Sequence, residues 1–338
     1  MKKYYPILLS KAGELTALSK LDQTSKNNTV PILQVLEEHI SKIESFYSHW
    51  NFAGNELFLD FSLTDPFNIR SVSALIRHLQ ANGVNVVPVV QENSNQIYLT
   101  LIRNLINNAE INKICIRFSN DNGGFFNINP TIRTLISGLG ATPKQASLLL
   151  DFGFIKSLNL TQIEANAVNV IHSIQNREDY DNIIISSGSF LDNLGSLHPA
   201  GRVYRLPRFE WQLWSYLQAQ TSITGTIKYS DYGTKHPVYS EANFQGSCSI
   251  KYTVVDEYVI YRGEKSSNHL DGNGQYVTFA SRLVASTDYS GALFSWGDER
   301  IDFFASQLLN DPNRKTGNAG SWVEISQNHH ITLLTSIL

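Results

Sequence analysis

Three carboxylates and one guanidinium stand near the C-terminal ends of separate short apolar segments in this chain. They belong to Asp60, Arg117, Asp151 and Asp231. If folding brings them to one concave site, the carboxylates could act as acid and base, hold a divalent cation such as Mg²⁺, or bind a polar ligand. The alternative is a buried charge network without a catalytic part, because buried charges need partners.

Further polar side chains occupy the same position after their own apolar segments. They are Lys11, Glu14, Gln34, Gln91, Ser187, Ser189 and Tyr232. We expect Glu14 to be catalytic together with the three aspartates. The ligand-binding set that we expect comprises Arg117, Lys11, Gln34, Ser187, Ser189 and Tyr232, with Lys11 and Arg117 neutralising a bound anion.

An arginine-rich segment, HPAGRVYRLPRFEWQLW, covers residues 198–214. Its Arg202 and Arg205 suit phosphate, because a guanidinium makes bidentate hydrogen bonds with oxyanions. Nearby Tyr204 and Trp211 could stack on a base. The alternative is a solvated loop whose tryptophans pack on the next helix.

These polar residues can meet only if their apolar segments become neighbouring strands. Segments that start at residues 29, 57, 85 and 113 are each 28 residues apart, which fits one strand, one helix and two short loops. We predict strands at 4–11, 29–35, 57–62, 85–91, 113–119, 147–153, 182–189 and 225–233, and helices at 37–50, 71–83, 96–109, 129–140, 161–175 and 209–220. This alternation predicts an α/β fold, an eight-stranded (β/α)8 TIM-like barrel, in which chemistry takes place at the C-terminal strand ends and phosphate often binds after strands seven and eight.

The rhythm of strand and helix stops after Gly233. Residues 247–263 alternate like a β-hairpin, and helical patterns follow at 276–286 and 299–309. The tail HHITLLTSIL could be a strand or a closing helix, and we favour the helix because Asn328 is a suitable cap. The sequence therefore predicts a barrel body over 1–233 and, over 234–338, a C-terminal extension that contains the hairpin and packs on the barrel.

The composition of the 338-residue chain excludes several classes of protein. A net charge of −3 gives no general basic field, so non-specific nucleic-acid binding is not expected. Cys115 and Cys248 cannot form a disulfide framework or a four-cysteine zinc site. The first apolar run is too short for a signal peptide or a membrane span, which predicts a cytoplasmic protein without a membrane partner.

Two regions of the chain resemble the beta protein family of bacteriophages and prophages. The opening YYPILLSKAGEL and the later blocks FSWGDERI (294–301) and TGNAGSWVEISQNHHITLL (316–334) carry the resemblance. Its motif positions here are Lys11, Gly13, Glu14, Trp296, Gly297, Asp298, Gly317, Asn318, Trp322, Asn328, His329 and His330. The resemblance adds Trp296, Asp298, Asn328 and His329 to the expected ligand-binding set. Gln34 departs from the glutamate that the family more often carries.

The resemblance implies a phage- or prophage-encoded protein of a phage-defence or host-killing locus in a bacterial host, and it supplies no settled activity. Two hypotheses follow. The first is a protein that binds or acts on a phosphorylated or nucleotide-like molecule; as an enzyme it would be a hydrolase of phosphorylated substrates, with or without a metal ion. The second is a non-catalytic sensor or protein-binding partner, antitoxin-like or recognising a phage protein, with the hairpin as its contact surface.

Overall fold

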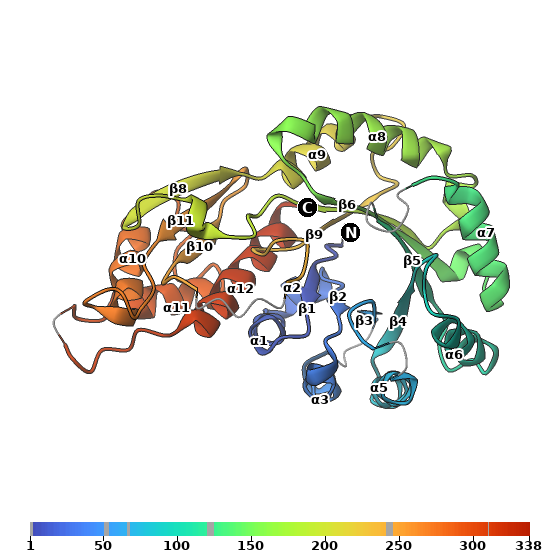
Figure 1. The fold of residues 1–338 in the computed structure, drawn as a ribbon, viewed down its shortest axis with the longest axis horizontal. Helices are drawn as coiled ribbons and strands as arrows, with labels where there is room; N and C mark the ends of the chain where they lie inside the picture. Colours follow the sequence, from blue (N-terminus) through green and yellow to red (C-terminus); the bar gives the residue numbers. More distant parts are fainter. Residues whose placement is uncertain (1–2, 51–53, 66–67, 120–124, 241–245, 310) are drawn as a thin grey trace.

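Eight parallel strands form one sheet, as the sequence pattern predicts. The computed structural model describes residues 3–50, 54–65, 68–119, 125–240, 246–309 and 311–338. The strands lie in the order β1-β2-β3-β4-β5-β6-β7-β9 (Figure 1). Their bounds are β1 (Ile7–Leu9), β2 (Ile32–Gln34), β3 (Glu56–Asp60), β4 (Asn85–Val90), β5 (Ile114–Ser119), β6 (Ala146–Phe154), β7 (Asn182–Gly188) and β9 (Lys228–Asp231).

The two edge strands of this sheet meet and close it into a barrel. Tyr4, just before β1, pairs with Tyr229 of β9 in a parallel bridge, and the N–H of Tyr5 donates to the carbonyl of Tyr229 at 3.0 Å. The β9–β1 seam therefore has fewer ladder contacts than the other strand pairs. The predicted (β/α)8 barrel is confirmed.

Apolar side chains alternate between the inside of the barrel and the layer under the helices. The inner cluster includes Ile7, Ile32, Phe58, Cys115, Leu149 and Ile184, all completely buried. Their strand neighbours, such as Leu8, Leu33, Leu59 and Leu148, belong to the larger core that the helices cover. Burial on both faces explains why the strands read as continuous apolar runs.

Helices lie outside the strands, at most of the predicted positions (Figure 1). They are α1 (Ala12–Ser19), α2 (Gln23–Asn27), α5 (Ile69–Ala81), α6 (Gln96–Asn107), α7 (Ile128–Leu139), α8 (Leu160–Ser173) and α9 (Phe209–Gln218). Short 3-10 turns are η1 (Glu37–His39), η3 (Pro143–Gln145), η4 (Ser157–Asn159), η5 (Arg177–Asp179), η6 (Leu194–Ser196) and η7 (Gly272–Gly274).

The single helix predicted over 37–50 is wrong. It is divided into η1, α3 (Ile40–Glu44) and α4 (Tyr47–Trp50). The hydroxyls of Ser45 and Ser48 donate to the carbonyls of Lys42 and Ser45 at 3.0 Å, and such local bonds compete with a continuous helix.

The C-terminal part adds a second sheet and three helices. The predicted hairpin is present as β10 (Ile250–Thr253) and β11 (Glu257–Arg262), which pair in antiparallel fashion. The third strand, β8 (Arg202–Pro207), lies in the arginine-rich segment and pairs with β11. The helices are α10 (Gln275–Val284), α11 (Trp296–Ala305) and α12 (Ala319–Ile337). Figure 1 shows this sheet and the three helices beside the barrel.

The closing helix starts before the predicted cap. The side chain of Asn318 accepts from the N–H of Ser321 at 3.1 Å, whereas Asn328 lies buried within α12. No helix among the described residues has both the length and the apolar character of a membrane-spanning helix.

Candidate functional site

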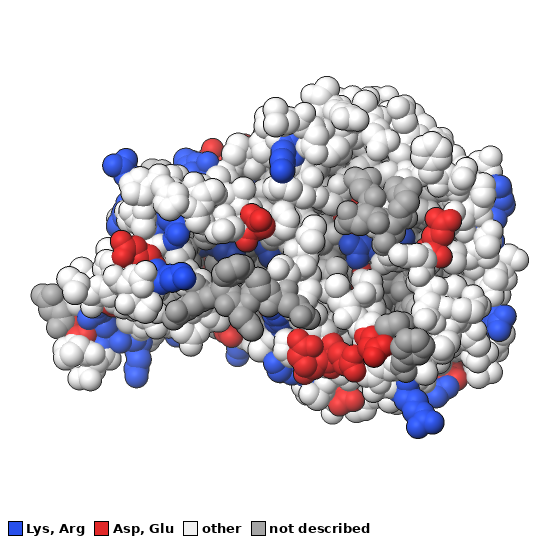
Figure 2. All heavy atoms as spheres, viewed as in Figure 1, with Lys and Arg blue, Asp and Glu red and all other residues white. Residues whose placement is uncertain are grey.

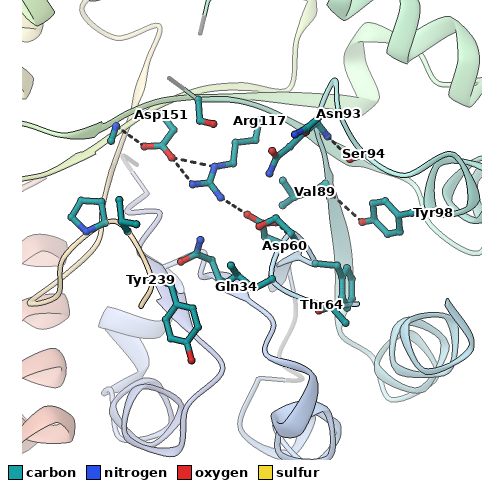
Figure 3. A pocket seen from close by; sticks show the side chains of 18 of the residues that line it. Gln34, Asp60, Thr64, Val89, Asn93, Ser94, Tyr98, Arg117, Asp151 and Tyr239 are labelled. Carbon is teal, nitrogen blue, oxygen red and sulfur yellow. Dashed lines mark hydrogen bonds and ion pairs between the residues drawn. The ribbon is translucent and has the colours of Figure 1, made fainter. Parts of the chain in front are cut away.

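A cavity of about 800 Å³ opens at the C-terminal ends of the barrel strands. Gln34, Asp60, Gln91, Arg117 and Asp151 line it from five different strands or the loops that directly follow them. Figure 3 shows Asp60, Arg117 and Asp151 pointing toward one another at its centre. The structure thus brings together much of the polar set that the sequence places at the strand ends.

Strand register explains why these three charged residues meet. Leu149 and Asp151 of β6 lie two residues apart, so both face the barrel interior, as do Cys115 and Arg117 of β5. Phe58 and Asp60 of β3 repeat the pattern. Each charged side chain therefore stands one layer above the apolar interior.

Arg117 is locked between the two carboxylates. Its Nη1 donates to Asp60 Oδ2, and its Nη2 and Nε donate to Asp151 Oδ2 at 2.5 and 3.1 Å. Arg117 is 9% exposed and each aspartate 1%. Tyr232 Oη completes the network, because it donates to Asp151 Oδ2 at 2.5 Å and lies 3.0 Å from Arg117 Nη2.

The second oxygen of each carboxylate is also bound. Asp60 Oδ1 accepts from the N–H of Ser62 at 2.9 Å, and Asp151 Oδ1 accepts from the N–H of Gly153 at 3.0 Å. Both aspartates therefore have the geometry of the charge network that the sequence left open as an alternative. Their catalytic role stays a prediction.

The protonation of this network follows from its charges. Burial disfavours the charged guanidinium, but Tyr232, Asp151 and Asp60 raise the pKa of Arg117 above its ordinary value. Burial and the neighbouring Asp151 raise the pKa of Tyr232, which keeps its hydroxyl protonated as a donor. The described residues contain no group of three or more His, Cys, Asp or Glu side chains arranged to hold a metal ion.

The cavity walls also carry neutral amides and aromatic rings, and of those named next only Gln34 and Gln91 were singled out in the sequence. The amides are those of Gln34, Gln91, Asn93 and Asn95, and the rings those of Phe61, Tyr98, Phe152, Phe154 and Tyr239. Tyr98 Oη donates to the carbonyl of Val89 at 3.0 Å. Figure 3 places Tyr98 and Tyr239 at opposite ends of the cavity. Most of these residues come from loops or helices, where periodicity gives no signal for them.

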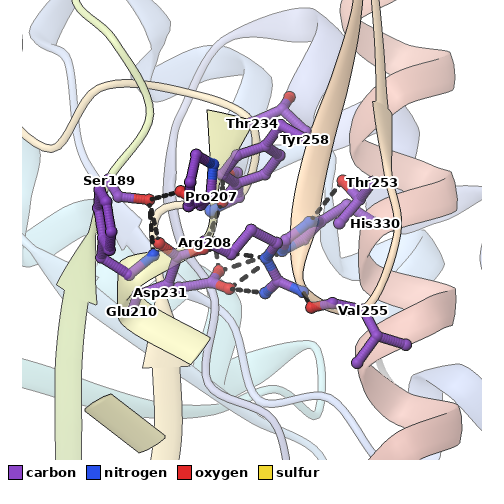
Figure 4. A network of polar contacts seen from close by, with 12 residues as sticks. Ser189, Pro207, Arg208, Glu210, Asp231, Thr234, Thr253, Val255, Tyr258 and His330 are labelled. Atoms are coloured by element: carbon purple, nitrogen blue, oxygen red, sulfur yellow. Dashed lines mark hydrogen bonds and ion pairs between the residues drawn. The ribbon is translucent and has the colours of Figure 1, made fainter. Parts of the chain in front are cut away.

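Asp231 lies apart from the cavity, on the other face of β9. Tyr232 faces inward, so the preceding Asp231 faces outward. There it accepts from Tyr4 Oη and, on Oδ2, from Tyr229 Oη at 2.8 Å and Arg208 Nη2 at 3.4 Å. Figure 4 shows this second network, in which His330 Nε2 also lies 3.1 Å from Asp231 Oδ2.

The charge on Asp231 is well stabilised in this network. Burial alone would raise its pKa, but His330, Arg208 and the hydrogen bond from Tyr4 hold the pKa well below its ordinary value. Ser189 belongs to the same network, since its hydroxyl donates to Glu210, and Glu210 accepts from Arg208 Nε at 3.0 Å. Ser187 is buried at the end of β7, paired in register with Asp231, and does not line the cavity.

Lys11 and Glu14 lie beside the cavity and not among its lining residues. The carboxylate of Glu14 is 4% exposed and accepts from the N–H of Leu9. Burial raises its pKa, while Lys235, Lys11 and Lys251 act in the opposite direction. Lys235 and Lys251 were not singled out in the sequence, because they follow Gly233 and lie outside the predicted strand ends.

Arg202 and Arg205 are not brought to the cavity, since both lie on β8 in the second sheet. Arg205 is already neutralised, because its Nε donates to Glu257 at 2.6 Å and its Nη1 to Asp288 at 2.8 Å. A phosphate-binding role for these two arginines stays a prediction, without support from the cavity.

Trp296, Asp298 and His329 form contacts inside the extension, and Asn328 joins the extension to α1 of the barrel. His329 Nδ1 lies 2.7 Å from Asp298 Oδ2 and its Nε2 lies 2.8 Å from the carbonyl of Thr253. Asn328 Oδ1 accepts from the N–H of Gly297 at 2.8 Å, and its Nδ2 donates to the carbonyl of Ala17 at 3.0 Å. Asp298, Asn328 and His329 are completely buried, and Trp296 packs on the core of the extension. None of the four lines the cavity.

Comparison with known proteins gives one firm relationship. A candidate fructose-1,6-biphosphate aldolase from Coccidioides immitis is similar at 11% identity and a TM-score of 0.36, over 68% of this chain and 76% of that one. Orotidine 5'-monophosphate decarboxylase from Sulfolobus solfataricus is similar at 12% identity and a TM-score of 0.34, over 68% and 87%. Neither likeness bears on ligand or reaction, and no curated protein matches. The Beta protein family model matches residues 4–335, so this chain belongs to the Beta protein family.

Proposed function

We propose that the cavity at the barrel mouth binds a small molecule of the nucleotide class. The observation that carries the proposal is the combination of six aromatic rings, Tyr232 included, with four side-chain amides around about 800 Å³ of space. This volume lies in the usual range for small-molecule sites, and such sites pair apolar walls with a few polar groups. The aromatic rings suit the face of a planar base, and the amides suit its edge.

The charges at the floor of the cavity favour binding over catalysis. Arg117 holds Asp60 and Asp151, so neither carboxylate is available as a base or a cation ligand while this contact persists. A hydrolase activity would require the ligand to displace Arg117 first. We therefore propose a binding role and leave the predicted catalysis by Asp60 and Asp151 as a secondary proposal.

The test is a binding titration by calorimetry with adenosine, guanosine, cytidine and uridine. We expect at least one nucleoside to bind the wild type, and Tyr239→Ala to weaken that binding about tenfold or more, because stacking on an aromatic ring contributes about 1–3 kcal/mol per base. Tyr216→Ala is the matched control, since Tyr216 lies on α9, is 39% exposed and does not line the cavity. Equal weakening by both variants, or no binding by any nucleoside, would count against the proposal.

For the biological setting we propose a phage-defence or host-killing role, which is motivated by the motif resemblance. The test is expression in a bacterial host followed by phage plating and growth curves. We expect a change in plating or growth that Tyr239→Ala reduces and Tyr216→Ala leaves intact. A protein-binding role for the hairpin is less well supported, because Tyr252, Tyr258 and Tyr261 are 1%, 1% and 3% exposed and pack inward.

A further inference from the structure

A cluster of lysines lies beside the cavity, where β9 and β1 meet. Lys11 follows β1, Lys235 follows β9, and Lys251 lies on β10. All three are within electrostatic reach of the buried carboxylate of Glu14, whose pKa each of them lowers. In the described parts of the chain, none of the three lysines makes a direct ion pair with a carboxylate. The carboxylate of Glu14 faces these three ammonium groups. Asp151 also faces Lys235 but is paired with Arg117, so two positive charges are left in excess.

Specific contacts place two of these lysines against the cavity wall. Lys235 Nζ donates to Gln34 Oε1 at 3.3 Å and lies 5.1 Å from the ring centre of Tyr232. Lys11 Nζ lies 5.0 Å from the ring centre of Tyr239. Gln34, Tyr232 and Tyr239 all line the cavity. The ammonium groups are therefore one side chain away from the space that a ligand would fill.

Lys251 completes the cluster from the side of the extension. Its Nζ donates to the carbonyl of Thr234 at 3.0 Å, directly before Lys235 in the chain. Lys235 and Lys251 are half-buried and Lys11 is exposed, so an anion can reach the cluster from solvent.

The other charges around the mouth leave this side as the one suited to an anion. At the floor, two carboxylates outweigh the single guanidinium of Arg117. Figure 2 shows acidic side chains gathered beside the mouth, over α3 and α5. Glu37 and Asp65 are both exposed; Asp65 lines the cavity, and Glu37 accepts from Asn68 Nδ2 at 2.6 Å.

We propose that Lys11, Lys235 and Lys251 bind the phosphoryl group of a phosphate monoester whose organic part occupies the cavity. The proposal rests on the proposed function and deepens it, since it assigns the anion to a site distinct from both Arg117 and the β8 arginines. Three ammonium donors can satisfy the oxygens of a tetrahedral dianion, and the two excess charges match its charge.

Burial also affects the protonation of two of these lysines. Burial lowers the pKa of Lys235 to about 8 and that of Lys251 to about 8. The groups that face Lys235 are Glu14, Arg117, Asp151 and Lys11, and Glu14 also faces Lys251. A bound dianion would raise both pKa values, so monophosphate affinity should fall as the pH rises from 7 to 9.

The experiment compares each nucleoside with its 5'-monophosphate, and adds inorganic phosphate as a separate probe, by calorimetry at pH 7. We expect at least one monophosphate to bind the wild type about tenfold or more tightly than its nucleoside, equal to about 1.4 kcal/mol. Lys235→Gln should lower the affinity for the monophosphate at least about fivefold more than the affinity for the nucleoside, and Lys235→Arg should restore most of the loss. Lys144→Gln is the matched control, because Lys144 is an exposed lysine on η3, before β6.

The outcomes separate this inference from the proposal for the cavity. If a nucleoside binds but its monophosphate binds no more tightly, or if Lys235→Gln weakens both equally, the lysine site is refuted while the cavity proposal stands. If no nucleoside binds but inorganic phosphate does, and Lys235→Gln abolishes that binding, the lysine site is supported and the cavity proposal fails. Wild-type protein that binds neither monophosphates nor phosphate overturns the inference.

Discussion

At the scale of single residues, the direction of each side chain along its strand decides its role. Asp60, Arg117 and Asp151 point into the barrel and meet, whereas Asp231 points outward into a separate network. Both networks pair one arginine with two carboxylates, Arg117 at the cavity and Arg208 under the helices. A strand end with a charged residue therefore does not by itself mark the site.

Replacing Arg117 tests how firmly the cavity floor is held. Arg117→Met leaves two buried carboxylates without their cation, which should lower the free energy of unfolding by about 3–5 kcal/mol at pH 7. The loss should shrink at acid pH, where the carboxylates take up protons. Urea unfolding measures it, and Arg205→Met is the control, because breaking a half-exposed ion pair costs about 0–1 kcal/mol. Equal losses for the two variants would show that the buried ion pairs of Arg117 stabilise the protein no more than the exposed pairs of Arg205 do.

At the scale of elements, the seam between β9 and β1 is the distinctive part of the barrel. Its backbone pairing is limited to the region of Tyr4 and Tyr229. His330 of α12 approaches the seam, with its Nε2 3.1 Å from Tyr4 Oη and its Nδ1 3.0 Å from Thr253 of β10. The extension therefore reinforces the barrel where its own ladder is shortest.

The packing of α11 on α12 depends on a small residue at position 297. A Cβ at Gly297 would lie 2.5 Å from the carbonyl oxygen of Ile325 and 3.1 Å from the N of His329. Only glycine allows this approach. The WGD and NHH motifs are thereby explained as one interface between two helices.

The carboxylate of Asp231 should make the stability of the seam depend on pH. Because its pKa is lowered in the folded protein, its contribution is complete above the unfolded value of about 4 and is lost as the pH falls below that value. Asp231→Asn should lower the unfolding free energy by about 3–5 kcal/mol at pH 6, and the difference from wild type should shrink toward pH 2. Urea titrations across this range measure the effect. Asp181→Asn, in a partly exposed pair with Lys113, should show a small difference at every pH.

At the scale of the whole molecule, barrel and extension share their cores. Ile331, Leu333 and Leu334 of α12 belong to the same apolar cluster as the barrel helices, and Asn328 bonds to α1. In the other direction, β8 leaves the barrel region to complete the sheet of the extension. The boundary that we place at residue 233 therefore divides the sequence, whereas the two parts pack on one another and share an apolar core.

A truncated chain should not fold as a barrel. We expect residues 1–233 alone to lose cooperative thermal unfolding, because the truncation removes α12 from the core and leaves β8 without β11. Circular dichroism during heating measures this, with the full chain as reference. Co-expression with residues 234–338 should restore part of the cooperativity. A cooperative transition for the fragment alone would show that the barrel folds without the extension.

The sequence by itself determined the barrel, the hairpin and the positions of most helices, because hydrophobic periodicity is a property of residues close together in the chain. It also placed Gln34, Asp60, Arg117, Asp151 and Tyr232 at one rim, where they are found. The tertiary structure decided which of these groups remain available to bind a ligand. Arg117 closes on two aspartates from other strands, β8 joins a distant hairpin, and Lys235 and Lys251 come within electrostatic range of Glu14. Such contacts join residues far apart in the chain, so they depend on register, side-chain direction and the packing of α12 on the seam, which no local pattern encodes.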